Sequence, residues 1–199
     1  GSPQDVAPPL DRSVSYDLYE ATRFLYTGSN PVQTGVAPDV INPRCVAVLR
    51  GNVLTRDREP LPGASISIKD RPEFGQTLSR ADGLFDFVLN GGETVIVEFQ
   101  KAGYLPVQRR VVTQRRQFET VEPVVLIQPD AQATAIDPTS TADFQVARGS
   151  VVSDTSGARQ ATLLFPQGAF TSVVSAQGAL HAAAQLTVRA TEYTVGTAG

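Results

Sequence analysis

The sequence predicts an all-β protein whose main domain is a sandwich of seven short strands between Val46 and Pro129. Two observations predict this fold class. Apolar and polar residues alternate within short segments, which is typical of strands that bury one face. Glycine-containing turn sequences separate these segments at intervals of about ten residues, with no helical pattern between them, as in antiparallel sandwiches.

Three segments show the alternation most clearly, namely 64–68, 85–89 and 94–101. Because successive side chains of a strand point to opposite faces, one face of each segment is apolar. The side chains that we expect in the core are those of Ala64, Ile66, Ile68, Phe85, Phe87, Leu89, Val95, Val97 and Phe99. The turns between the strands contain glycine, which adopts positive φ, and Asp82, which can bond to its own backbone.

An N-terminal extension, residues 1–45, precedes the sandwich. Its best helix candidate is Tyr16–Tyr26, where apolar residues recur near helical spacing. Ser13 or Ser15 is expected to cap its start, and Gly28 to close its end. A helix this short is marginal in water, so it must pack against the sandwich.

Two segments rich in proline and turn residues flank the sandwich. Residues 29–44 are expected to be extended and to wrap its surface, and residues 130–141 to form a linker. A second, smaller β unit is predicted at 142–199. With fewer than about 60 residues it has little core of its own. We therefore expect it to dock on the sandwich, which spans 46–129, or to be the first part of a truncated domain.

Composition excludes several classes of function. The net charge of −3 gives no general footprint for nucleic acid, and no apolar run approaches the length of a membrane span. The chain has no Met and opens with Gly1-Ser2, which indicates a fragment of a longer protein. A missing signal peptide therefore carries no information about localisation.

The chain has a single cysteine, Cys45, and a single histidine, His181. One cysteine cannot form an internal disulfide or a thiolate cluster for a metal. One histidine in an alanine-rich segment is expected to be an incidental surface residue rather than part of a catalytic triad. Cys45 is expected to be a small buried residue. We therefore predict no catalytic residues, no metal and no cofactor.

Two groups of residues are candidates for an interaction surface. Four arginines cluster around a predicted hairpin over 108–117, and they could guard a sheet edge or contact an anionic partner. Four aromatic residues crowd the N-terminal extension, where they could form a sugar-binding platform or anchor the helix. These residues are Arg109, Arg110, Arg115 and Arg116, and Tyr16, Tyr19, Phe24 and Tyr26.

Two further kinds of site were weighed. An isopeptide crosslink would join Lys69 or Lys101 to Asn90 beside an acidic residue, but the last strand offers no Asn where adhesins carry it. Calcium binding around Asp82 and Asp86 lacks the repeated Asp ligands of a calcium loop. The sequence leaves both questions open.

The motifs of this region carry a resemblance. Five motifs follow one another along the chain, namely Gly51-x-Val53, Pro60-Leu61-Pro62-Gly63-Ala64, Asp82-Gly83-x-Phe85-x-Phe87, Gly103-Tyr104 and Val124-Val125-Leu126. Because of these motifs, residues 46–129 resemble the carboxypeptidase regulatory-like family. The resemblance implies a transthyretin-like seven-stranded β-sandwich. It also implies a role in stability, spacing or binding rather than catalysis. The histidines of the urate-pathway hydrolase with this fold are absent.

The flanking segments extend the resemblance. Residues 24–28, 31–36, 148–152 and 160–166 are similar to the segments around this sandwich in bacterial YD-repeat (Rhs-type) proteins and in teneurins. This implies a structural module of a secreted or cell-surface protein, which spaces and docks neighbouring domains near a shell that encloses cargo. A carbohydrate-binding module of an extracellular bacterial protein is the alternative. The expected partners are neighbouring domains, a polysaccharide or another protein.

Overall fold

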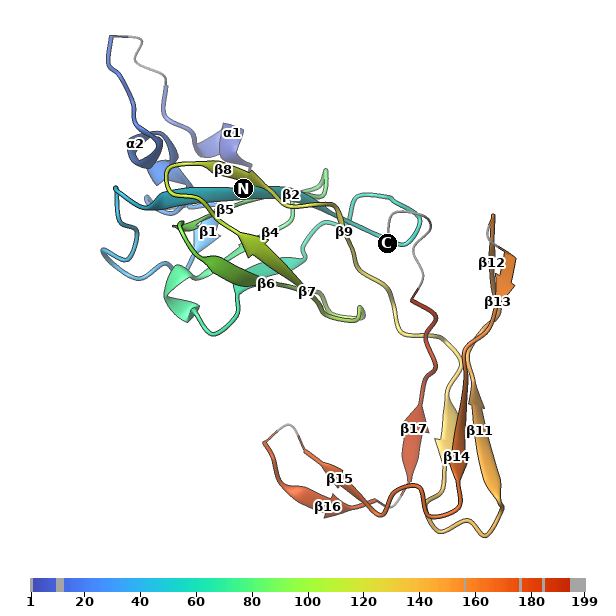
Figure 1. The fold of residues 1–199 in the computed structure, drawn as a ribbon. Coiled ribbons are helices and arrows are strands. Elements are labelled where there is room, and N and C mark those ends of the chain that lie inside the picture. The colour runs from blue at the N-terminus through green and yellow to red at the C-terminus, as the bar shows by residue number, and fades with distance from the viewer. Residues whose placement is uncertain (1, 10–12, 156, 176, 184, 194–199) are drawn as a thin grey trace. The chain divides into compact units, whose positions relative to one another are not determined.

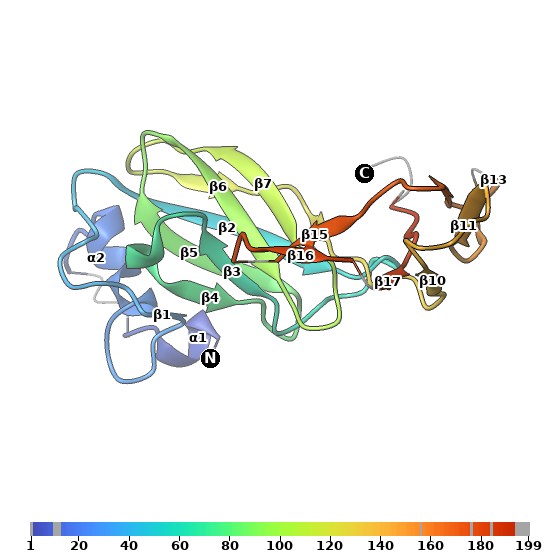
Figure 2. The same ribbon diagram turned by 90° about the horizontal axis from the view of Figure 1, so that it is seen from below.

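The computed structural model describes residues 2–9, 13–155, 157–175, 177–183 and 185–193. These residues fall into two compact units, divided between Ile127 and Gln128. Figures 1 and 2 show that strands dominate both units. The predicted domain boundaries at 45, 129 and 141 stay predictions.

The first unit is a sandwich of two facing sheets (Figures 1 and 2). One sheet has the strand order β1-β4-β3-β6-β7, and the other has the order β5-β2-β8, with β9 also paired to β2. The predicted all-β class is confirmed. The strands are β1 (Gln33–Thr34), β2 (Val46–Leu54), β3 (Ser65–Ile68), β4 (Gln76–Leu78), β5 (Leu84–Asn90), β6 (Thr94–Gln100), β7 (Val107–Val112), β8 (Phe118–Thr120) and β9 (Val124–Val125).

The core lies between the two sheets. All nine side chains expected there are buried, with exposed fractions of 4% or less. Phe85 of β5 and Phe99 of β6 meet edge to face with 5.6 Å between ring centroids, which joins the two sheets. Burying an aromatic or branched side chain contributes about 1.5–3 kcal/mol each, so this shared interior is the main source of stability.

The turn before β5 also forms as expected. The side chain of Asp82 accepts a hydrogen bond from the Leu84 N–H at 2.9 Å. Gly83 has a φ of 77°, and a Cβ there would lie 2.6 Å from the Val53 carbonyl oxygen. Only glycine fits this position without moving the backbone.

Two expectations for the sandwich were wrong. β2 pairs in parallel with β8 and β9, so the sheet is not purely antiparallel. Residues 108–117 do not form a hairpin either, because β7 pairs with β6 while β8 pairs with β2 of the other sheet. The intervening turn crosses between the sheets. Its Thr113 N–H bonds to Glu93, whereas the Arg116 N–H bonds to the carbonyl of Val46.

The N-terminal helix is shorter than predicted. It comprises α2 (Leu18–Thr22) and a single 3-10 turn, η1 (Arg23–Leu25). Asp17, not Ser13 or Ser15, caps it, because the Asp17 carboxylate accepts a hydrogen bond from the Glu20 N–H. Leu25 is buried at 2% exposure, so the helix does pack on the core.

Two further short helices belong to this unit. They are α1 (Pro3–Val6) and η2 (Pro72–Phe74). The aromatic ring of Phe74 in η2 is fully buried, and Arg71 lies over it with its guanidinium carbon 4.8 Å from the ring centroid. η2 therefore anchors the connection between β3 and β4 to the core through the side chain of Phe74.

The wrapping segment 29–44 contributes a strand, β1, that the sequence did not predict. Gln33 of β1 is 1% exposed, and its side-chain amide donates to the carbonyls of Phe74 and Val88 at 2.7 and 2.9 Å. Its amide oxygen accepts from the Val88 N–H at 2.6 Å. Val88 lies on the open edge of β5, so the side chain of Gln33 bonds this edge as a neighbouring strand would.

Asn90 closes the end of the same edge. Its side chain donates to the Val40 carbonyl and accepts from the Asn42 N–H, both at 2.8 Å. The amides of Gln33 and Asn90 thus hold the segment 32–42 along β5. This segment therefore bonds directly to the sandwich that it wraps.

The second unit consists of two-stranded ribbons. In the described residues, β10 pairs with β17, β11 with β14, β12 with β13, and β15 with β16. β10 lies within the stretch 130–141 for which the sequence predicts a linker. The strands are β10 (Thr134–Ile136), β11 (Phe144–Arg148), β12 (Val152–Asp154), β13 (Gly157–Arg159), β14 (Thr162–Pro166), β15 (Ser172–Val174), β16 (Leu180–Ala182) and β17 (Leu186–Val188).

Hydrogen bonds to the Asp130 side chain stabilise the start of this unit. Its carboxylate accepts from the backbone N–H groups of Gln132 and Ser150 at 2.7 Å and from the Ser150 hydroxyl at 2.9 Å. These bonds, the one from Gln132 first, hold the pKa of Asp130 below its usual value. A Cβ at Gly149 would lie 2.0 Å from the Ala190 carbonyl oxygen, so two backbone segments touch there.

We predict that Gln33→Ala lowers the free energy of unfolding by about 3 kcal/mol, because it leaves three buried backbone groups at Phe74 and Val88 without partners. Urea unfolding of the whole chain measures the loss. The matched control is Gln100→Ala, an exposed glutamine on β6, which should change stability by less than about 0.5 kcal/mol. Equal effects of the two substitutions would show that the bonds from Gln33 to Phe74 and Val88 do not stabilise the sandwich.

Candidate functional site

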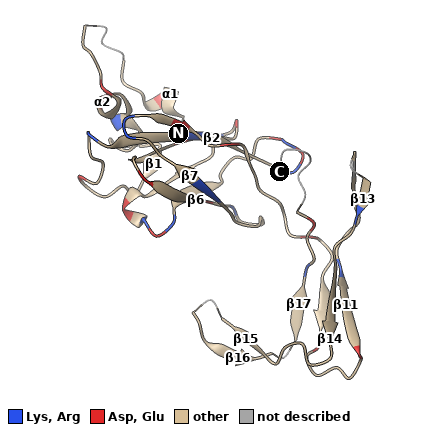
Figure 3. Ribbon diagram, in the orientation of Figure 1, with Lys and Arg blue, Asp and Glu red and all other residues tan. Residues whose placement is uncertain are grey.

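The four candidate arginines lie on one margin of the sandwich. Arg109 and Arg110 are on β7, the last strand of the five-stranded sheet, and Arg115 and Arg116 are in the turn that follows. All four are exposed. Figure 3 shows the basic colouring of β7. Among the described residues, no carboxylate lies within 4 Å of any of these four guanidinium groups.

β7 presents its two arginines to opposite faces. In the antiparallel register, Arg109 lies opposite the buried Val97 and Arg110 lies opposite Ile96. The guanidinium of Arg109 donates to the carbonyl of the preceding residue, Gln108, at 3.1 Å. One charge therefore points along the inner, core-facing side of the edge and the other along its outer side.

The four aromatic candidates divide into two kinds. Tyr19, Phe24 and Tyr26 are partly buried and pack against the core, whereas Tyr16 is 45% exposed. Burial, with the neighbouring Tyr19, raises the pKa of Tyr26 well above the usual value for a tyrosine. This packing agrees with the role of anchoring the helix. Sugar binding by these residues stays a prediction.

Sequence reasoning missed the most developed polar cluster. The carboxylate of Asp86, buried in β5, accepts hydrogen bonds from Arg50 at 2.6 Å and from Arg80 at 2.7 Å. The guanidinium of Arg50 also lies over the Phe118 ring, with 4.4 Å to the centroid. The signal was available, because Arg50 and Asp86 are direct partners in the β2–β5 register.

This cluster is suited to holding strands together rather than to chemistry. Both oxygens of the Asp86 carboxylate are occupied by guanidinium groups, so neither is available as a base or a metal ligand. Within the described residues, no group of three or more His, Cys, Asp or Glu side chains could hold a metal ion. His181 is exposed on β16, and Cys45 is half-buried rather than buried.

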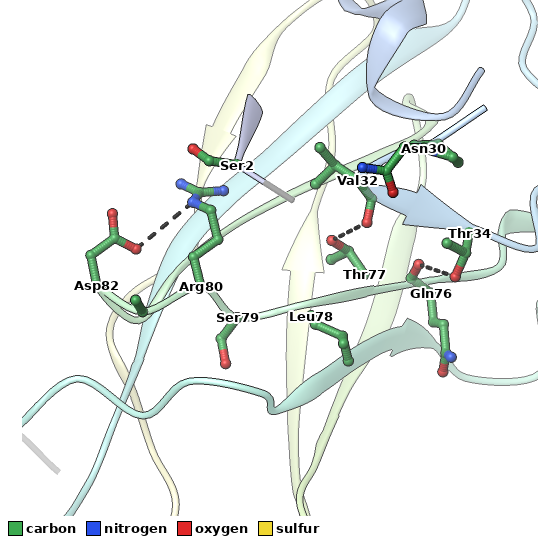
Figure 4. Close-up of a pocket in the computed structure, with 12 residues that line it drawn as sticks. Ser2, Asn30, Val32, Thr34, Gln76, Thr77, Leu78, Ser79, Arg80 and Asp82 are labelled. Carbon is green, nitrogen blue, oxygen red and sulfur yellow. Dashed lines mark hydrogen bonds and ion pairs between the residues drawn. The ribbon is translucent and has the colours of Figure 1, made fainter. Parts of the chain in front are cut away.

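A groove of about 650 Å³ runs along β4 and its neighbours (Figure 4). Val32, Thr77 and Arg80 are among its lining residues. The Thr77 hydroxyl donates to the Val32 carbonyl at 3.2 Å, and Arg80 lies 3.7 Å from Asp82. Neither histidine nor cysteine lines it. The groove offers no paired nucleophile and base.

The groups considered for a crosslink are engaged elsewhere. The Lys101 ammonium donates to the Pro62 carbonyl at 2.8 Å. The Asn90 amide is held by residues 40 and 42. Asp86 is bonded to two arginines. Lys101, Asn90 and Asp86 are thus each bonded to a different part of the sandwich.

Comparison with known proteins identifies the sandwich. Residues 41–126 match the model of the "Teneurin TTR-like domain" family. This segment is a teneurin TTR-like domain. The resemblance to teneurins inferred from the motifs is therefore confirmed. The match covers β2 to β9 but not β1, α2 or Gln33.

Individual relatives agree. The chain is 29% identical to human Teneurin-4 over 142 residues, which is 67% of this chain and 5% of that protein. It is 36% identical to human Teneurin-1 over 124 residues, 62% of this chain and 4% of that protein. It is 30% identical to Teneurin-m of Drosophila melanogaster over 65% of this chain and 5% of that protein. The chain thus spans about a twentieth of these relatives.

Solved structures show weaker similarity. A 3-chlorocatechol 1,2-dioxygenase from Rhodococcus opacus superposes with a TM-score of 0.38 and 9% identity, over 48% of this chain and 65% of the enzyme. The TIE protein of Bacillus anthracis gives a TM-score of 0.37 and 13% identity, over 74% of this chain and 32% of that protein. Neither value supports an inference about activity. In the part of the chain that the structure describes, no helix is long and apolar enough to cross a membrane.

Neutralising the four arginines should leave the TTR-like domain folded. We predict that the combined variant Arg109→Gln, Arg110→Gln, Arg115→Gln and Arg116→Asn unfolds within about 1 kcal/mol of the parent chain, because these side chains are exposed. Asn replaces Arg116 because its φ is 59°. Thermal unfolding followed by circular dichroism measures the effect. A large drop in the melting temperature would show that the arginines are structural.

Asp86→Ala should have the opposite outcome. We predict a loss of about 3 kcal/mol in the free energy of unfolding, because Arg80, whose side chain is only 17% exposed, would lose its main partner. The loss is at the low end for a buried pair because the Arg50 side chain is 56% exposed. Urea unfolding measures it against Asp57→Ala, a change in an exposed turn. A loss below about 1 kcal/mol would rule out this role for Asp86.

Proposed function

We propose that this chain is a non-enzymatic structural and interaction module of a larger extracellular protein, in which it spaces and docks the neighbouring domains. The similarity to human Teneurin-4 supports this proposal, because it extends over 142 residues and so reaches beyond the TTR-like domain itself. The occupied carboxylate of Asp86 and the lack of a nucleophile–base pair in the described groove support a role without catalysis.

One observation carries the spacing role. The chain is fixed where it enters the sandwich and where it leaves it. On entry, the segment 32–42 is bonded to the edge of β5 through Gln33 and Asn90. On exit, β9 pairs with β2, and the Leu105 N–H bonds to the carbonyl of Ile127. A domain with both ends built into its sheets can transmit a fixed spacing, whereas loosely attached ends cannot.

The setting of the parent protein is proposed on the same basis. We infer a secreted or cell-surface YD-repeat protein of the Rhs or teneurin type, with this chain upstream of its shell. The similarity to teneurins supports the inference of a teneurin-type parent protein. The alternative of a carbohydrate-binding module has less support, because three of the four aromatic candidates pack inward.

Distance measurements between spin labels test the spacing role in the full chain. With Cys45→Ser as background, one pair of labels would be placed at the exposed positions Asp57 and Gln167, one in each unit. A control pair at Asp57 and Glu122 lies within the sandwich. Double electron–electron resonance then gives the two distance distributions.

A rigid spacer predicts that the distribution between the units is nearly as narrow as the control distribution. A distribution several times broader than the control would contradict rigid spacing by this chain. Because the labels lie on exposed turns, they should not disturb either unit, and thermal unfolding checks this. The outcome does not depend on which ligand or partner the chain contacts.

A further inference from the structure

The open edge of β7 indicates which kind of partner this chain docks. β7 ends the five-stranded sheet, and it pairs on one side with β6 over six residues. Such an edge normally presents unpaired backbone groups that can accept another strand. Natural proteins cover or interrupt these edges, as Gln33 and Asn90 do for β5. Among the described residues, no other segment bonds to the edge of β7, and only the Arg109 guanidinium contacts it, at the Gln108 carbonyl.

The free backbone groups of β7 can be assigned by alternation. The Thr113 N–H donates to Glu93, and the Thr113 carbonyl accepts from Gly92, so Thr113 faces the β6 side. Since successive residues of a strand face opposite sides, Gln108, Arg110 and Val112 direct their N–H and C=O groups to the open side. The bond from the Arg109 guanidinium to the Gln108 carbonyl agrees with this assignment.

The side chains along this edge select the kind of strand that could add. Val112 is 64% exposed, which offers an apolar contact on the outer side. Arg109 and Arg110 place a positive charge on each side of the strand, and Arg115 and Arg116 extend the charge beyond its end. Opposite charges on directly paired strands are stabilising, and like charges are destabilising. An added strand therefore needs acidic residues at two successive positions.

A second copy of this chain is a poor occupant. Two β7 strands paired antiparallel would bring the arginines of one copy against those of the other. A polysaccharide would use the charges, but its hydroxyl groups do not repeat at the spacing of the N–H and C=O groups along a strand, and it would not use Val112. An extended peptide uses all three features.

We propose that β7 binds an extended acidic segment of a partner polypeptide by adding it as a further strand to the five-stranded sheet. This names the partner class for the docking role proposed above, on which it rests, but it does not depend on rigid spacing. Backbone bonds to Gln108, Arg110 and Val112 give the segment its alignment. The arginines select acidic sequences over neutral ones.

The test uses the full chain and a fluorescein-labelled peptide, Thr-Val-Thr-Glu-Glu-Val-Thr-Val, with fluorescence anisotropy as the readout. We expect saturable binding that weakens at least tenfold in the double variant Arg109→Gln and Arg110→Gln. The matched control, Arg23→Gln, removes an exposed arginine of η1, which contacts β5 of the other sheet, and should bind as the parent does. A peptide of the same sequence with an N-methyl group on every backbone amide should bind at least tenfold more weakly, because neither of its edges can donate to the ladder.

Amide exchange provides a second readout that needs no variant. On addition of the unmodified peptide, the N–H groups of Gln108, Arg110 and Val112 should exchange more slowly, as measured by NMR. Those of Arg109 and Val111, already bonded to β6, should change less. This pattern is expected of strand addition and not of charge attraction alone.

Three outcomes would overturn the proposal. Equal binding of the N-methylated peptide would show that charge alone is recognised. Tighter binding of a heparin fragment than of the peptide, without the exchange pattern, would assign the edge to a polysaccharide. Absence of binding would leave the arginines as a guard against aggregation. In each case, the spin-label distances decide separately whether the spacing role stands.

Discussion

The side-chain amide of Gln33 is the interaction on which the arrangement of the sandwich depends. It bonds to η2, which leads into β4 of one sheet, and to β5 of the other, from a strand that precedes both in the sequence. A primary amide has a donor and an acceptor in nearly the same geometry as a peptide group, so it can satisfy a strand edge without a strand. In the dry interior, losing such a partner is costly. The N-terminal segment is therefore fixed in place by the same bonds that complete the sandwich.

The edges of β5 and β7 differ in whether the chain covers them with its own residues, and this difference relates the fold to the proposed function. The edge of β5 is closed by side chains from the segment 32–42. The edge of β7 keeps free backbone groups but carries Arg109 and Arg110, which repel a second copy. A charged open edge discourages self-association and still permits pairing with a segment of opposite charge. The region suited to docking is thus set by which edge the chain covers with its own residues.

Several ion pairs of the sandwich hold its strands and turns together. Asp86 ties β5 to β2 through Arg50 and to the preceding turn through Arg80. Arg71 similarly bonds Glu73 and Glu93 while lying over Phe74. Because these carboxylates are already bonded to arginines, they are not free to act as a general acid or base. These polar side chains hold the strands and turns of the sandwich in place.

The sequence by itself determined the fold class, the core and the family. Alternation at Ile66, Phe87 and Val97 fixes which face is buried, since a strand has a period of two residues. It also determined where glycine and Asp82 make turns, because these are local effects of backbone geometry. Only the tertiary structure decided which strands pair. The parallel pairing of β2 with β8, the crossing at 113–117, and the insertion of Gln33 beside Val88 join residues far apart in the chain. Such contacts depend on packing and on the bonding needs of buried backbone groups, which local sequence patterns do not encode.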